Sequence, residues 1–101
     1  MSFIQMTKPI QLCIPKVSNQ ITRQQIFETF CKLKIGRINR LTENPLRADP
    51  AYKRVVLSIN WDNNQPLAKE IQDVLKDPAE HMNVVYDMPW YWQIYANHPQ
   101  R

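Results

Sequence analysis

Apolar and polar residues alternate along several stretches of the chain, and this two-residue period is typical of β-strands with one buried face. The clearest stretch is 52–61, where Val55, Leu57 and Ile59 would share the buried face. A shorter alternation over 10–14 stops at Pro15, and another covers 38–41. Each predicts a strand, and a loop rich in proline and cap-type residues is expected over 42–50.

Two other stretches carry apolar residues at helical spacing and predict helices near 22–34 and 64–76. Thr22 and Gln25 have the spacing of a capping box, and Ile21 with Ile26 that of a hydrophobic staple. Asn64 is the expected N-cap of the second helix, with Pro66 in its first turn. The residues expected to be buried between helices and strands are Phe27, Phe30, Cys31, Leu57, Ile59, Ile71, Leu75 and Ile94.

The segment 84–96 is dense in aromatic and β-branched residues, which favour strands, and it contains Pro89, which cannot donate a hydrogen bond within a sheet. We therefore expect a short extra strand over 83–86, a tight connection shaped by Asp87 and Pro89, and a last strand that continues to residue 96. Alternation along the last strand predicts the inward residues Trp92, Ile94 and Ala96 and the outward residues Tyr91, Gln93 and Tyr95.

The predicted order is β-α-β-β-α-β with an extra short strand before the last. Two βαβ halves of this length give an α+β sandwich of the ferredoxin-like type, in which both helices cover one face of an antiparallel sheet with strand order 4-1-3-2. A single domain is expected over 9–97, with a loose segment at 1–8 and a tail at 98–101.

The composition argues against most catalytic and cofactor-binding classes. One glycine in 101 residues excludes glycine-rich phosphate loops. Cys13 and Cys31 lack zinc-site spacing and predict two buried thiols, so neither a metal nor a cofactor is expected. Asp62, Asp87 and His81 lie in predicted turns or loops without a catalytic partner, and the chain is predicted not to be an enzyme. The absence of a signal peptide or membrane span predicts an intracellular, reducing location without a membrane partner.

The charge is mildly basic, with a net charge of +4, and is unevenly distributed. Seven basic and two acidic residues lie in 32–54, whereas six acidic and two basic residues lie in 62–87. Such a basic segment favours polyanionic partners, although it also fits an ordinary solvated surface.

Several short motifs resemble those of the RNA recognition motif (RRM) superfamily, and more closely those of small RRM-like proteins of large nucleocytoplasmic DNA viruses. The motifs are Cys13-Ile14-Pro15, Ile21-Thr22, Tyr52-Lys53-Arg54-Val55, Trp61-Asp62-Asn63-Asn64 and Val85-Tyr86-Asp87-Met88-Pro89-Trp90-Tyr91-Trp92. The resemblance covers nearly the whole chain. It implies the same sandwich fold and suggests RNA binding through the open face of the sheet.

RRM domains stack bases on aromatic residues of strands one and three, and the corresponding outward positions of this chain carry no aromatic residue. The outward residues are Cys13 on strand one and Val56 and Ser58 on strand three. The predicted site therefore shifts to strand four: Tyr91, Gln93 and Tyr95 beside Cys13 and Val56, with Arg37, Arg40 and Arg54 further across the face.

The predicted function is weak, largely sequence-unselective binding of RNA or single-stranded DNA, with arginines on phosphates and tyrosines stacked on bases. The alternative is a protein-interaction or homodimerisation surface on the same face or an edge strand. In a third interpretation the rings serve only the fold, as is expected for Trp61, Trp90 and Trp92.

Overall fold

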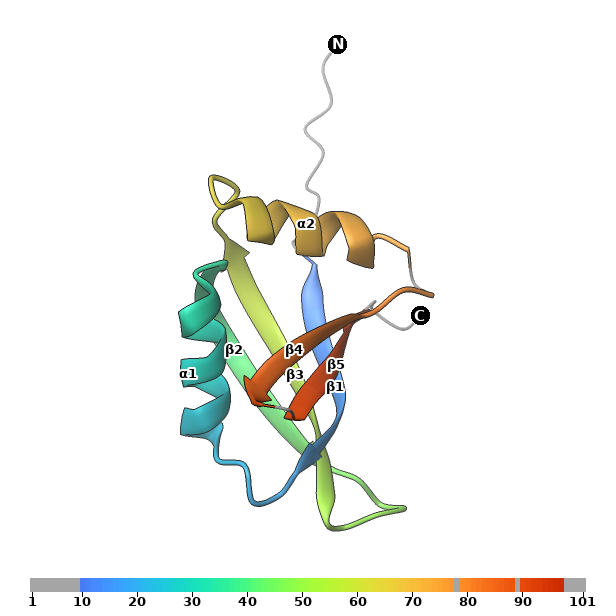
Figure 1. Ribbon diagram of the computed structural model, residues 1–101. Helices are drawn as coiled ribbons and strands as arrows, with labels where there is room; N and C mark the ends of the chain where they lie inside the picture. The colour runs from blue at the N-terminus through green and yellow to red at the C-terminus, as the bar shows by residue number, and fades with distance from the viewer. Residues whose placement is uncertain (1–9, 78, 89, 98–101) are drawn as a thin grey trace.

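The computed structural model describes residues 10–77, 79–88 and 90–97. The predictions for 1–8, Pro89 and 98–101 lie outside these residues. Within the described residues, the chain forms five strands and two helices (Figure 1). In chain order they are β1 (Gln11–Ser18), α1 (Arg23–Leu33), β2 (Gly36–Pro45), β3 (Tyr52–Trp61), α2 (Pro66–Leu75), β4 (Met82–Asp87) and β5 (Trp90–Asn97).

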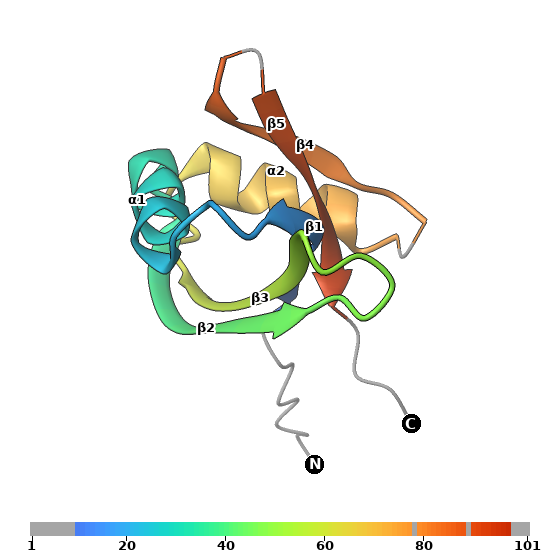
Figure 2. The ribbon, with the colours of Figure 1, turned by 90° about the horizontal axis from the view of Figure 1, so that it is seen from below.

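The strands form one antiparallel sheet in the order β2-β3-β1-β5-β4. This differs from the expected order 4-1-3-2, because the extra strand joins the sheet outside β5 and makes it five-stranded. The sheet is curved, and both helices lie on its concave side (Figure 2). The α+β class is thereby confirmed, and the arrangement is compatible with a ferredoxin-like fold.

The core lies between the sheet and the helices. Alternation along β3 buries Val55, Leu57 and Ile59, as expected. From the other side of the core, α1 and α2 contribute Ile26, Phe30, Ala68, Ile71 and Leu75. The remaining strands add mainly β-branched and aliphatic side chains, so the concave face of the sheet is apolar apart from Lys53 and Glu43.

Trp92 joins the C-terminal hairpin to this core. Only 4% of its surface is exposed. Its indole stacks on Tyr86 with ring centroids 4.3 Å apart and lies nearly parallel to Phe30 at 6.3 Å. A ring packed against two others couples β4, β5 and α1 at one point.

The start of α1 agrees with its predicted capping box. Thr22 Oγ1 accepts a hydrogen bond of 3.1 Å from the Gln25 backbone, and Gln25 Oε1 accepts one of 2.8 Å from the Thr22 backbone. The prediction for α2 was wrong by one residue. Its N-cap is Gln65, which makes no side-chain cap bond, and Pro66 is the first helical residue. The Asp62 carboxylate accepts from the Asn64 backbone at 3.1 Å and holds Asn64 in the preceding turn.

Two residues of α1 that were expected to be buried are exposed. Ile26 and Phe30 face the core, whereas Phe27, one position further around the helix, is 42% exposed. Cys31 follows Phe27 by four residues, shares its side of α1 and is also exposed. The expectation of two buried thiols therefore holds only for Cys13.

Two strands are longer than their sequence patterns predicted. β1 continues through Pro15 to Ser18, and β2 runs from Gly36 to Pro45 instead of 38–41. Gly36 begins β2 at a φ of 149°, where a side chain would meet the backbone oxygen of Asn60. Close backbone contact, and not a helix end, is the reason for glycine here.

Lys53 is the one buried charged residue among those described. Its ammonium donates a 2.7 Å hydrogen bond to the Ile21 carbonyl and pairs with the Glu43 carboxylate of β2. The lysine thus links β3 to β2 and to the turn before α1, and both contacts compensate for its burial.

Candidate functional site

The convex face of the sheet, called the open face below, is not covered by either helix (Figure 2). Residues that pair across antiparallel strands point to the same face. Cys13 pairs with Val56 of β3 and with Tyr95 of β5, so these three predicted residues form one row in the middle of the open face. Cys13 is only 7% exposed and therefore offers a ligand little contact surface.

Arg37 and Arg40 lie on the open face because β2 contains a bulge. Arg37 pairs with Asn60 and Arg40 with Ser58, and the extra residue between the two pairs is Asn39. Without the bulge, residues three apart would point to opposite faces. Both arginines are exposed at the β2 edge of the open face.

Arg54, the third predicted arginine, is half-buried and already has a partner. Its guanidinium donates a 2.9 Å hydrogen bond to the side-chain oxygen of Asn97 on β5. The Asn97 amide nitrogen in turn donates to Gln11 Oε1 at 3.3 Å. Since β1 lies between β3 and β5, the Arg54 side chain spans the middle of the open face.

No acidic residue lies on the open face within the strands that the structure describes. Glu43 pairs with Val55 and therefore points to the helix side. Asp87 lines a groove with Gln25 and Glu28 of α1, also on the helix side. The open face is consequently cationic, with its three arginines unopposed by carboxylates on the same strands.

The aromatic residues of β5 divide as alternation predicts. Trp92 and Ile94 are buried under the helices, whereas Tyr91 is 51% exposed and Gln93 is exposed. Tyr95 is half-buried, and its ring lies 5.4 Å from that of His81. Tyr91 is therefore more accessible to a ligand than Tyr95.

A cleft opens where β5 leaves β1. The two strands pair only over Gln11–Cys13 and Tyr95–Asn97. Beyond Cys13, β1 contains Pro15 and bulges against β3. Because Pro15 has no N–H to offer a neighbouring strand and the bulge bends β1, the two strands separate.

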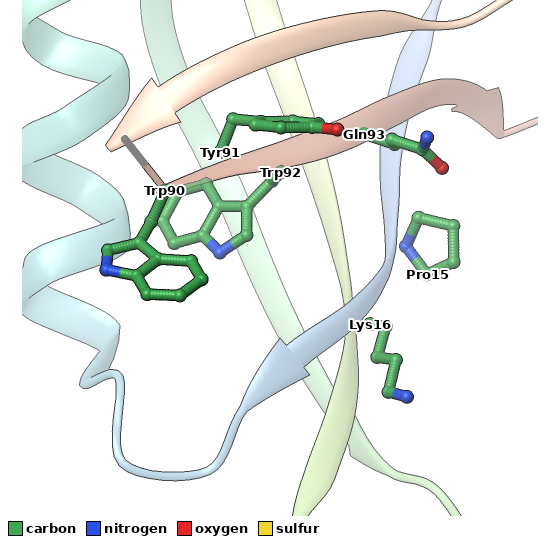
Figure 3. Close-up of a pocket in the computed structure, with 6 residues that line it drawn as sticks. All are labelled: Pro15, Lys16, Trp90, Tyr91, Trp92 and Gln93. Carbon is green, nitrogen blue, oxygen red and sulfur yellow. The ribbon is translucent and has the colours of Figure 1, made fainter. Parts of the chain in front are cut away.

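The cleft has a volume of about 370 Å³ and is lined by Pro15, Lys16, Trp90, Tyr91, Trp92 and Gln93. Figure 3 shows Pro15 and Lys16 on the β1 side and the indoles of Trp90 and Trp92 on the β5 side. Tyr91 lies on the opposite side of β5 from the two indoles (Figure 3). The cleft is therefore bordered by residues from both the open face and the helix side of the sheet.

Trp90 and Lys16 have the properties of ligand-binding residues that the sequence analysis missed. Trp90 was assigned to packing, but it is 64% exposed. The Lys16 ammonium lies 4.2 Å from the centroid of the Tyr52 ring and 4.0 Å from an Asp49 carboxylate oxygen. The sequence around Pro15 and Lys16 gave no clear signal of this site, because a proline at this point fits either the end of a strand or a bend within it.

The predicted residues thus fall into three groups. Cys13, Val56, Arg54 and Tyr95 lie together in the middle of the open face. Arg37 and Arg40 lie at its β2 edge, opposite the end of β3. Tyr91 and Gln93 lie beside the cleft on β5. A ligand that contacts all three groups must cross the sheet.

Other kinds of site have less support in the residues that the structure describes. No three histidine, cysteine, aspartate or glutamate side chains among them are close enough together to hold a metal ion. Neither α1 nor α2 has the length and apolar character needed to cross a membrane.

Comparison of the chain with protein-family models, with curated proteins and with solved structures found no match. The relationship to RRM-like proteins, including those of large DNA viruses, therefore stays a prediction.

Proposed function

We propose that this protein is a non-catalytic, intracellular binding module of the RRM-like type. It binds single-stranded nucleic acid, RNA or DNA, through the open face of its sheet, weakly and with little sequence preference. The observation that carries the proposal is a face with Arg37, Arg40 and Arg54 and no acidic residue among its described strands. If the edge strand β4 is left out, the remaining strands follow the order β5-β1-β3-β2. This is the 4-1-3-2 order expected of an RRM-like sandwich, and it supports the proposal.

The arginines supply the electrostatic part of binding. Arg37 and Arg40 are exposed, and Arg54 uses one N–H for Asn97 and keeps others for a phosphate oxygen. Three phosphate contacts on a single strand give a slope of about −2 in a plot of log affinity against log salt. Affinity should then fall roughly twentyfold between 50 and 200 mM salt.

The exposed rings supply the stacking part. Tyr91 and Trp90 are each more than half exposed beside the cleft. Stacking of one base on such a ring contributes about 1–3 kcal/mol, and every base has a face that can stack. Binding that combines phosphate contacts and stacking is tolerant of sequence.

Fluorescence anisotropy with labelled RNA and DNA strands of about twelve nucleotides tests the proposal. The double variant Arg37→Ala/Arg40→Ala should bind both strands more weakly, with a salt slope smaller by about 1.4. The control is Lys69→Ala, which removes an exposed charge from α2 on the helix side. No binding at low salt, or equal losses in the double variant and the control, would refute the proposal.

One observation favours the alternative of a protein-interaction surface. The β4–β5 hairpin carries four large apolar side chains that are each at least half exposed: Val85, Met88, Trp90 and Tyr91. Val85 and Tyr91 pair across the two strands and share one face. Aromatic residues and methionine are enriched in interface cores. Light scattering at two protein concentrations tests for self-association, and Tyr91→Glu should abolish a dimer that uses this surface.

A further inference from the structure

The cleft between β1 and β5 exists because two strands separate, and its walls consist of rings, an amide and a cation. Its volume of about 370 Å³ falls within the size range of small-ligand sites, roughly 300–1,000 Å³. Arg37 and Arg40 lie on β2, at the far edge of the open face and away from the residues that line the cleft. The cleft can therefore bind a part of the ligand that those arginines do not contact.

We propose that this cleft holds one unpaired base of the bound strand, stacked on Trp90. The cleft then makes the protein prefer single-stranded over double-stranded nucleic acid. The proposal rests on the nucleic-acid binding proposed above and adds the place where an unpaired base is held, which is the physical reason for the single-strand preference. A base within a duplex is paired and stacked on both sides, and it would have to leave the helix to enter.

The lining residues match a nucleotide part by part. The indole of Trp90 offers a flat, 64% exposed surface on which a base can stack. On the opposite wall, the ammonium of Lys16 can neutralise the adjoining phosphate.

The charges around the cleft allow an anion to bind. No acidic residue lines it among the residues described. Asp49 is 4.0 Å from Lys16, but both side chains are about half exposed, and such ion pairs contribute little. A phosphate can therefore replace this carboxylate at Lys16.

Three probes of about twelve nucleotides test the proposal at low salt: oligothymidylate, an abasic strand of the same length and charge, and a duplex. The wild-type protein should bind oligothymidylate about thirtyfold more tightly than the abasic strand, because only the former can stack on Trp90 and Tyr91, and each ring contributes at least about fivefold. Trp90→Ala should lose about fivefold of this preference, and Trp90→Phe should keep it. Phe27→Ala, which truncates an exposed ring on α1, is the control and should bind like wild type.

The outcomes separate this proposal from the one on which it rests. Salt-dependent binding of all three probes with equal affinity would overturn the base-binding cleft and leave the open-face function standing. An unchanged preference in Trp90→Ala, with melting like that of wild type, would also overturn it. Binding of none of the probes would refute both proposals.

Discussion

The guanidinium of Arg54 on β3 donates a 2.9 Å hydrogen bond to the side chain of Asn97 on β5, across the strand that separates them. This bond holds a cationic group in the middle of the open face before any ligand arrives. A preorganised group loses less conformational entropy on binding than a free arginine does. The same bond explains why Arg54 is half-buried whereas Arg37 and Arg40 are exposed.

We expect Arg54→Ala and Asn97→Ala to have different effects on nucleic-acid binding. Arg54→Ala removes the charge and should reduce the salt slope by about 0.7. Asn97→Ala keeps the charge and only frees the side chain, so affinity should fall slightly while the slope stays the same. Anisotropy titrations at four salt concentrations measure both. An unchanged slope in Arg54→Ala would show that this arginine contacts no phosphate.

Tyr91 and Tyr95 should respond differently to truncation. Tyr91→Ala should weaken binding by about 1–3 kcal/mol and change the free energy of unfolding by less than about 1 kcal/mol, because Tyr91 is half exposed. Tyr95 is half-buried against His81, so Tyr95→Ala should destabilise the fold by about 1–2 kcal/mol. Urea denaturation and anisotropy of the two variants provide the comparison. Equal stability losses would contradict the assigned burial.

Trp92 should be the tryptophan on which the fold depends. Trp92→Ala removes a buried ring packed on Tyr86 and Phe30 and should cost about 3–5 kcal/mol of unfolding free energy. Trp90→Ala, two residues away and largely exposed, serves as the matched control and should cost under about 1 kcal/mol. Thermal melting followed by circular dichroism measures both, and the reverse ranking would contradict the structure of the hairpin.

Gly36 should tolerate no side chain. Its φ of 149° is unfavourable for other residues, and a Cβ would lie 2.1 Å from the Asn60 oxygen. We expect Gly36→Ala to destabilise the protein by about 1–3 kcal/mol. Chemical denaturation checks this value. A loss below about 0.5 kcal/mol would indicate that β2 begins in another conformation.

Much of the fold was predictable because its signals are local. The capping box of Thr22 and Gln25 depends on residues three apart, and the alternation in β3 continues without interruption. The same two-residue period also predicted which residues of β5 point toward the helices and which point away from them. These features depend on no distant contact, so the sequence pattern alone was sufficient.

The bulges and the resulting cleft were not predictable from the same pattern. A bulge adds one residue to one strand and reverses which side chains face the helices, as Asn39 does between Ile38 and Arg40. Whether a proline ends a strand or bends it depends on the neighbouring strand, so the sequence around Pro15 does not show that β1 continues past it. The exposure of Trp90 depends on the distance between β5 and β1, which no local pattern encodes.

Binding through the open face is tested most directly by NMR, with amide chemical shifts mapped as single-stranded RNA is added at low salt. We expect shifts to concentrate at Arg37, Arg40, Arg54 and the 90–93 segment, and residues 23–33 and 66–75 in the two helices to stay unchanged. Addition of salt should reverse the shifts. Shifts confined to the helices, or none at low salt, would contradict binding through the open face.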